Sequence, residues 1–267
     1  MIPKSVKHLA LLFVVLLASN QAISQVCDLS ISEQRKTQVT TMSAPFSYVV
    51  HVEMKRGRTY SGTAFFIHPR VLLTAGHNLR KRPQFIFTRV KALTLRFGAT
   101  NETTNLYQTH IVTTQNDNIY TLDSFNRDYS IAEDYGIIIL PDETAYHKCG
   151  NGIFNLTVFN PANTSQAINI AGYPGNEPLR TQWTDKTNNY KFDGECIRYD
   201  FSTEHGVSGA PIWYDQGDKH NVFAIHTNGG TGSNQNQCNT ATVITQTIYN
   251  DIVKFCTSKG ITIAPAD

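Results

Sequence analysis

Most of the chain alternates between short apolar runs and turn residues. The runs are rich in β-branched and aromatic side chains and are bounded by Gly, Pro, Asn or Asp, a pattern that predicts β-strands. The predicted strands are FSYVVHVEM (46–54), GTAFFI (62–67), RVLLTA (70–75), ALTLRFG (92–98), YGIIIL (135–140), AINIAGY (167–173), KFDGECIRYDF (191–201), APIWY (210–214), VFAIH (222–226) and ATVIT (241–245). So many short strands in a chain of 267 residues favour β-barrels or a β-sandwich.

A long helical period appears near the C-terminus. Ile248, Ile252, Phe255 and Cys256 recur at spacings of three and four residues. This spacing predicts a helix over about residues 245–258, with one apolar face turned toward a core.

The predicted strands form two groups, separated by a polar and irregular stretch at residues 141–162. We assign residues 41–145 to an N-terminal β-domain and residues 146–267 to a C-terminal β-domain that includes the terminal helix. Residues 25–40 are an N-terminal segment or a propeptide, and removal near Arg35-Lys36 stays open.

The first residues predict export. Lys4 and Lys7 precede an apolar run at residues 9–18, and Ala22-Ile23-Ser24 offers small residues at the two positions that a signal peptidase reads. The run is shorter than the roughly 20 apolar residues that a spanning helix needs. We therefore predict a signal peptide at residues 1–24, cleavage before Gln25, and a secreted protein, extracellular or periplasmic, with no membrane attachment.

Removal of that segment leaves a nearly neutral chain. Residues 1–24 hold two of the 23 Lys and Arg residues and no acid, so 23 − 2 = 21 bases face 21 acids. No run of Lys or Arg is long enough to indicate binding to nucleic acid.

Five cysteines follow the predicted signal peptide. In an exported chain they can form up to two disulfides and leave one thiol over, in a pairing that the sequence does not define. Their spacing contains no CxxC pair, so no zinc site is expected. They are Cys27, Cys149, Cys196, Cys238 and Cys256.

Gly206 and Gly209 flank Ser208 in the stretch TEHGVSGAPIW (203–213). Gly and Ser are common in turns, so an ordinary turn is one interpretation. The other is a backbone that approaches a ligand closely, because glycine has no β-carbon. A nucleophilic serine also needs a base, and the base needs an orienting carboxylate.

His77 and Asp134 are the candidate base and carboxylate. His77 ends the apolar stretch GTAFFIHPRVLLTAGHNL (62–79) at a point where the chain must turn, although a lone surface histidine is the plainer interpretation. Asp134 leads into YGIIIL, where a charge is costly unless it is paired, although it could simply end a loop. With Ser208 they follow a known triad order, and the amides of Gly206 and Ser208 are the candidate oxyanion hole.

The stretches TAGH (74–77), EDYGIII (133–139) and GVSGAP (206–211) resemble the catalytic boxes of trypsin-fold serine proteases. YDFSTEHGVSGAPIW (199–213), FAIHTNGG (223–230) and AGYPG (171–175) are similar in particular to the glutamyl endopeptidase branch. The resemblance implies an all-β fold of two six-stranded antiparallel β-barrels with a C-terminal α-helix. It also implies that His77, Asp134 and Ser208 form the triad.

The same resemblance implies the substrate. Thr203 and His226 would hold the carboxylate of a glutamate that precedes the scissile bond, and Gly229 would leave room for the substrate backbone. The implied protein is a secreted, monomeric serine endopeptidase that forms an acyl-enzyme, prefers Glu or Asp, acts on proteins or peptides, and uses no metal or other cofactor.

Val207 departs from the trypsin pattern, in which an Asp before the nucleophile pairs with a newly cut N-terminal amine. The glutamyl endopeptidase branch also lacks that Asp. Two alternatives stay open. One is a protease of the same fold with another specificity, since Glu204 adds a charge near the pocket. The other is a non-catalytic binding protein on this fold, although none of the three triad residues is missing.

Overall fold

The computed structural model describes residues 35–56, 58–81, 88–89, 92–97, 108–113, 118–122, 130–162, 165–178, 180–194, 196–229 and 239–265. The predicted signal peptide and its cleavage point lie outside these residues, as do Cys27 and Cys238. Within the described residues, no helix combines the length and apolar character needed to cross a membrane.

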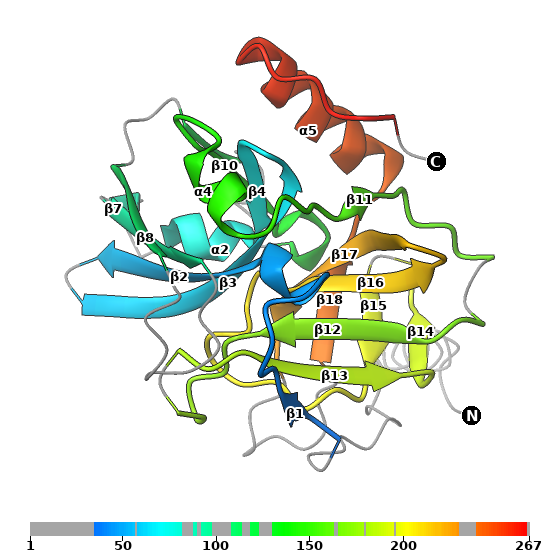
Figure 1. Ribbon diagram of the computed structural model, residues 1–267. Helices are drawn as coiled ribbons and strands as arrows, with labels where there is room; N and C mark the ends of the chain where they lie inside the picture. Colours follow the sequence, from blue (N-terminus) through cyan, green and yellow to red (C-terminus); the bar gives the residue numbers. More distant parts are fainter. Residues whose placement is uncertain are drawn as a thin grey trace, which may run out of the picture.

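The first of two large antiparallel sheets occupies the upper left of Figure 1. Its strand order is β8-β7-β2-β3-β4-β10-β9, and every neighbouring pair is antiparallel. The strands are β2 (Val49–Arg56), β3 (Arg58–His68), β4 (Val71–Thr74), β7 (Ala92–Phe97), β8 (Gln108–Thr113), β9 (Ile119–Thr121) and β10 (Gly136–Ile139).

The second sheet has the order β1-β13-β12-β16-β17-β18-β15-β14, and β11 pairs with β17 in the parallel sense. Its strands are β1 (Thr37–Gln38), β11 (Asn155–Leu156), β12 (Ile168–Gly172), β13 (Trp183–Thr187), β14 (Tyr190–Phe192), β15 (Cys196–Tyr199), β16 (Pro211–Gln216), β17 (Lys219–Asn228) and β18 (Asn239–Val243). The smaller elements are β5 (Arg80–Lys81), β6 (Thr88–Arg89), α2 (Gly76–Leu79), α4 (Thr144–Lys148), α5 (Gln246–Ser258), and the 3-10 turns η1 (Phe46–Tyr48) and η2 (Ile131–Glu133).

These two sheets and the C-terminal helix confirm the predicted all-β fold class. In the described residues the sheets hold seven and nine strands rather than six each, because two-residue strands such as β1 and β11 join the second sheet. The predicted helix is present as α5, and the side chain of Thr245 caps it by accepting a hydrogen bond from the amide of Ile248.

Two predictions at the element level are wrong. Residues 191–201 are the hairpin β14–β15 rather than one strand, because Gly194 turns the chain with a φ of 100°, a conformation that favours glycine. The segment at residues 141–162 is not wholly irregular, since it contains α4 and β11. Strand β13 escaped prediction because its sequence, WTDKT, contains mostly polar residues.

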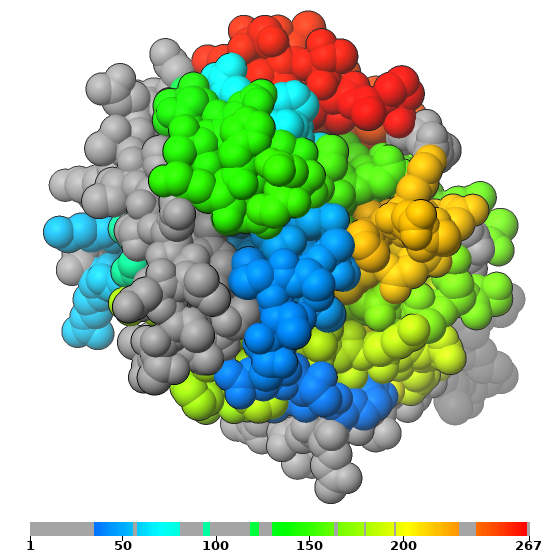
Figure 2. All heavy atoms as spheres, in the orientation of Figure 1, coloured from blue at the N-terminus to red at the C-terminus, as the bar shows by residue number. Residues whose placement is uncertain are grey.

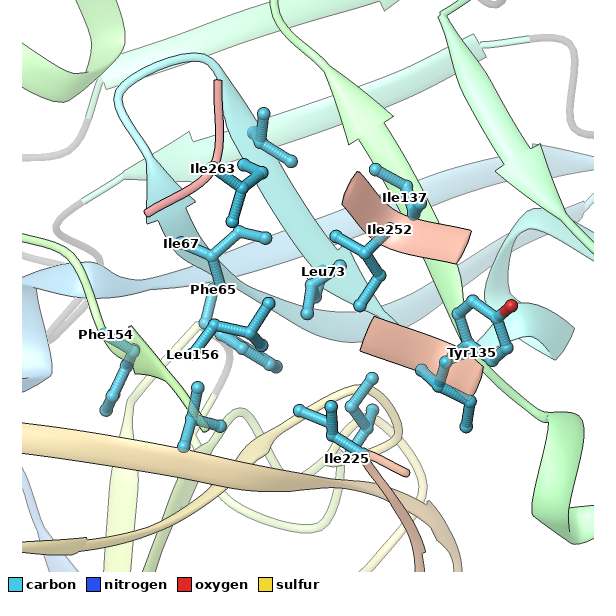
Figure 3. Close-up of a cluster of buried hydrophobic side chains, with 14 of the residues drawn as sticks. Phe65, Ile67, Leu73, Tyr135, Ile137, Phe154, Leu156, Ile225, Ile252 and Ile263 are labelled. Carbon is cyan, nitrogen blue, oxygen red and sulfur yellow. The ribbon is translucent and has the colours of Figure 1, made fainter. Parts of the chain in front are cut away.

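One hydrophobic core joins both sheets to helix α5 (Figure 3). Leu73 and Ile137 come from the first sheet, and Ile225 comes from the second. Ile252 of α5 packs into this cluster and is 0% exposed. The helix therefore covers the junction between the two sheets, where a β-sheet face would otherwise be open to water.

We expect Ile252→Ala to reduce the free energy of unfolding by about 2–5 kcal/mol, because it leaves a cavity among side chains from both sheets. Chemical denaturation followed by fluorescence or circular dichroism measures the change. Lys254→Ala is the matched control, since Lys254 lies on the exposed side of the same helix. Equal effects of the two substitutions would contradict a packing role for α5.

Candidate active site

His77 and Asp134 are joined by two hydrogen bonds. His77 lies in α2, directly after β4, and Asp134 follows η2 and leads into β10. The ring Nδ1 of His77 is 2.7 Å from Asp134 Oδ2, and the backbone amide of His77 donates to Oδ1 at 2.8 Å. An ionised carboxylate only accepts hydrogen bonds, so Nδ1 carries the proton and Nε2 is left as an acceptor.

The glycines around Ser208 are required by close backbone contacts. Gly206 has a φ of 102°, and a β-carbon there would lie 2.3 Å from the carbonyl oxygen of Tyr173. Gly209 has a φ of 90°, and its β-carbon would lie 2.0 Å from the carbonyl oxygen of Thr63. Both glycines are thus required by contacts with the protein's own backbone, which neither the ordinary turn nor the approach to a ligand had named.

Residues of the first sheet and of α2 hold the Ser208 loop. The backbone amide of Thr63 and the side-chain amide of Asn78 both donate to the carbonyl of Ser208, each at 2.8 Å. Thr63 Oγ1 also donates to the carbonyl of Gly206 at 2.8 Å. Because Asn78 directly follows His77, these bonds bring the candidate nucleophile and base to the same corner of the molecule.

Two backbone amides of the loop point to no protein acceptor. Across the described part of the chain, the amides of Gly206 and Ser208 make no hydrogen bond, and neither does the Ser208 hydroxyl. Donors of this kind are what a developing oxyanion needs. A serine without a bond to its base is common in substrate-free sites, where such bonds tighten when substrate arrives.

His226, on β17, is buried and uncharged. Burial is the main cause that lowers its pKa to about 3, the charge of His77 adds to this, and a hydrogen bond with the backbone of Thr240 opposes it. The hydroxyl of Tyr199 lies 2.6 Å from His226 Nδ1. That hydroxyl has no other partner in the described chain, and burial raises its pKa well above 10, so it donates to Nδ1. The proton of the neutral ring is therefore on Nε2.

The buried hydroxyl of Thr203 has no hydrogen-bond partner among the described residues. Its Oγ1 would lie 3.1 Å from a β-carbon at Gly229, and Asn239 Oδ1 would lie 3.4 Å from the same point. A larger residue at position 229 would thus crowd Thr203. We call Thr203, His226 and Gly229 the wall of the candidate pocket. An unpaired buried hydroxyl costs about 1–3 kcal/mol, which suggests a group that is paired only when a ligand is present.

Sequence reasoning missed the residues that support these side chains. Tyr199, Asn78 and Thr63 were not singled out, since each lies in or beside an apolar stretch and looks like an ordinary strand or turn residue. A polar side chain inside an apolar run was the available signal for Thr63. Tyr199 gave no signal beyond a hydroxyl on a residue of a predicted strand.

Three of the five cysteines, Cys149, Cys196 and Cys256, are described; all are buried, and none forms a disulfide with another described residue. The sequence allowed up to two disulfides with one thiol over; no disulfide occurs among the described residues, and Cys27 and Cys238 lie outside them. These three thiols lie in separate parts of the fold, on α4, β15 and α5 or next to them. No group of three potential metal ligands occurs among the described residues.

A cavity of about 190 Å³ beside the second sheet lies away from this chemistry. Its lining includes Phe159, Tyr214 and Phe223 but neither the triad candidates nor Thr203. A much smaller cavity of about 10 Å³ lies beside Thr203 and Val207. This smaller cavity touches both Thr203 and the Ser208 loop.

Comparison with known proteins supports the predicted resemblance. No family model matches the chain. The chain is 34% identical over 125 residues to glutamyl endopeptidases of Staphylococcus aureus strains MRSA252 and MW2, a match that covers 46% of this chain and 33% and 36% of those proteins. The chain therefore spans about a third of the length of the curated relatives it matches.

Solved structures share the fold. A Glu endopeptidase in complex with MPD aligns with a TM-score of 0.68 at 19% identity, over 86% of this chain and 99% of that one. The thermostable serine protease AL20 from an extremophilic microorganism aligns with a TM-score of 0.62 at 15% identity, over 79% and 98% of the two chains. Protease Anisep from Arthrobacter nicotinovorans gives 0.60 at 12% identity, over 83% and 99%. The predicted trypsin-like architecture is thereby confirmed.

We expect the buried neutral His226 to make the protein less stable in acid. An unfolded histidine takes up a proton near pH 6.5, whereas the folded His226 stays neutral down to about 3. Below pH 6.5 the unfolded state thus binds more protons than the folded state, so the free energy of unfolding decreases as the pH is lowered. His226 contributes a decrease of roughly 2 kcal/mol between pH 6.5 and pH 5. Denaturant unfolding at several pH values measures the slope.

In that experiment His226→Gln should make the acid slope shallower, because the titrating group is gone. His147→Gln is the control for the substitution itself, since His147 is an exposed histidine on α4. His51 also has a pKa lowered by burial, to about 4, and supplies the slope that remains. An unchanged slope in His226→Gln would mean that His226 takes up its proton at the same pH in the folded and the unfolded protein.

Proposed function

We propose that the protein is a secreted serine endopeptidase that cuts peptide bonds after glutamate through an acyl-enzyme. The observation that carries the proposal is that two hydrogen bonds join His77 to Asp134. Asn78, the residue after His77 on α2, donates to the Ser208 carbonyl. The likeness to glutamyl endopeptidases supports it, although the matched region is about a third of those proteins. Export is supported by the signal-like residues 1–24.

In the proposed reaction, Ser208 Oγ attacks the carbonyl carbon of the scissile bond while His77 Nε2 takes the hydroxyl proton. Asp134 holds the ring tautomer and stabilises the imidazolium that forms. The free amides of Gly206 and Ser208 stabilise the oxyanion of the tetrahedral intermediate. His77 then gives its proton to the leaving amine, and a water molecule, activated by His77, hydrolyses the acyl-enzyme.

The preference for glutamate rests on two neutral donors in the wall. Thr203 Oγ1 is buried without a partner, and the N–H of His226 is on Nε2. That N–H is shared with the backbone of Thr240 in the free protein, but a carboxylate is a stronger acceptor than an amide carbonyl. A bound carboxylate would also raise the pKa of His226, because a nearby negative charge favours the protonated ring.

Two other functions have less support. A preference for Lys or Arg would need an unpaired acid at the pocket wall. Ser202 and Thr203 are neutral, Glu204 is the next residue in the chain, and Asp185, which lines the same small cavity, is already paired with Arg35. A binding protein without activity would not need the hydrogen bond between His77 and Asp134, nor the two loop amides that make no hydrogen bond in the described chain.

Ser208→Ala should abolish activity while leaving the fold intact, because it removes one hydroxyl that makes no hydrogen bond in the described chain. We expect the turnover number to fall by a factor on the order of 10⁶. Hydrolysis of a peptide library and labelling by a serine-directed phosphonate measure this. A Ser208→Ala enzyme that still cuts peptides at the wild-type rate would overturn the assignment.

Thr203→Val should lower kcat/KM for substrates with Glu before the scissile bond by about tenfold, because one hydrogen bond to a carboxylate is lost without a change in volume. Substrates with Leu at that position should be cut as before. Thr240→Val is the matched control. Thr240 also has a buried hydroxyl without a partner, but it follows Asn239 on β18 and so faces the other side of the sheet. Cleavage after Lys or Arg as readily as after Glu would end the pocket assignment and leave the triad assignment standing.

A further inference from the structure

The N-terminal segment of the described chain lies along the surface of the second sheet. Figure 2 shows its first residues in dark blue, beside the yellow-green strands. Strand β1 pairs with β13, and the amide of Val39 donates to the carbonyl of Gln182 at 2.8 Å. This segment is therefore built into the fold by backbone hydrogen bonds.

Arg35 binds two acids that come from opposite ends of the second sheet. Its Nε is 3.1 Å from Asp185 Oδ1 on β13, and its Nη1 and Nη2 are each 2.9 Å from the carboxylate oxygens of Asp200, next to β15. Nη2 also donates to the Asp200 carbonyl at 3.2 Å. Since β13 and β15 lie toward opposite ends of the strand order, the guanidinium links the two edges of this sheet.

The two acids depend on Arg35 for their charge balance. Asp185 and Asp200 are each 5% exposed. Burial raises the pKa of Asp200, but the hydrogen bond from Arg35, which is the largest of the opposing causes, acts with bonds from Thr187 and Asn189 and with the charge of Arg35 to lower it overall. Asn189 Nδ2 donates to Asp200 at 3.2 Å, but it is neutral. Without Arg35, two buried carboxylates would face each other with no cation between them.

Asp200 also lies inside the segment that forms the pocket wall. It directly follows Tyr199, which donates to His226, and it precedes Thr203 by three residues. A shift of Asp200 would therefore move Thr203, and it would move His226 through the hydrogen bond with Tyr199. Lys36, the next residue after Arg35, binds Glu177 at 2.6 Å and lines the small cavity beside Thr203 and Val207.

We propose that Arg35 is a positioning residue for the specificity pocket: it fixes Asp200 and thereby holds Tyr199 and Thr203 in register with His226. The proposal rests on the proposed function for the identity of the pocket. It has a consequence for maturation. An active enzyme must keep Arg35, so any N-terminal processing ends before residue 35 and the residues of β1 belong to the mature protein.

The test compares Arg35→Gln and Arg35→Lys with Arg198→Gln in the full secreted protein. Arg198 is the matched control, because its ion pair with Asp193 has a similar exposure, 35% for the arginine against 33% for Arg35. Kinetics are measured per titrated active site, with Glu and Leu substrates, at a temperature well below unfolding for every variant.

We expect Arg35→Gln to raise KM for the Glu substrate by about tenfold or more, with a smaller change in kcat and in the Leu substrate. Arg35→Lys should recover part of the loss, since it keeps the charge but not the two-pronged contact. Arg198→Gln should match the wild type. A lower melting temperature with unchanged KM in Arg35→Gln would assign Arg35 a purely structural role and overturn the proposal.

If Arg35→Gln does not fold, the double variant Arg35→Gln/Asp200→Asn replaces it, because it also removes the charge of one of the two carboxylates that Arg35 binds. Its KM for Glu should still be raised, and a wild-type KM would refute the positioning role. N-terminal sequencing of the active protein supplies an independent readout: a fully active chain that begins at Lys36 or later would also refute it. A wild-type enzyme without Glu preference would instead refute the proposed function, and the Arg35 effect would then be read on the preferred substrate.

Discussion

One carbonyl oxygen determines where the candidate nucleophile lies. The Ser208 carbonyl accepts from the amide of Thr63, in the first sheet, and from the side chain of Asn78, in the helix that follows β4. The Ser208 loop itself belongs to the second half of the chain. The position of Ser208 relative to His77 therefore depends on how the two sheets pack against each other. That packing depends in turn on the hydrophobic core that the two sheets share.

The glycines on either side of Ser208 make this attachment possible. Gly206 and Gly209 each have a positive φ and face backbone oxygens at distances that exclude any side chain. A loop fixed in this way keeps its amides directed outward without rearrangement at the moment of reaction, which is the arrangement that stabilises a developing negative charge most effectively.

The wall of the proposed pocket follows a different principle, since it recognises a charged group with neutral donors. Tyr199 fixes the tautomer of His226, and burial keeps the ring uncharged. A neutral wall avoids the cost of a buried unpaired charge in the free protein. The charged pairs are kept behind the wall, where Arg35 neutralises Asp185 and Asp200.

Local sequence patterns were sufficient for the strands with apolar runs and for helix α5, because those patterns report directly on burial. They failed for β13 and for the β14–β15 hairpin, where polar residues or one glycine determine the path of the chain. The pairing of His77 with Asp134 was predictable because both side chains stand at the ends of strongly apolar strands. The contacts of Arg35, Asn78 and Tyr199 were not, since each joins residues far apart in sequence, and no local pattern records such a partner.

The most direct test of the account is a double-mutant cycle on His77 and Ser208, measured as kcat/KM on a Glu substrate. If the two residues act as one chemical unit, His77→Ala and Ser208→Ala should each remove nearly all activity, and the double variant should lose little more than either single variant. Losses that multiply would show that the residues act independently, and would contradict the central claim.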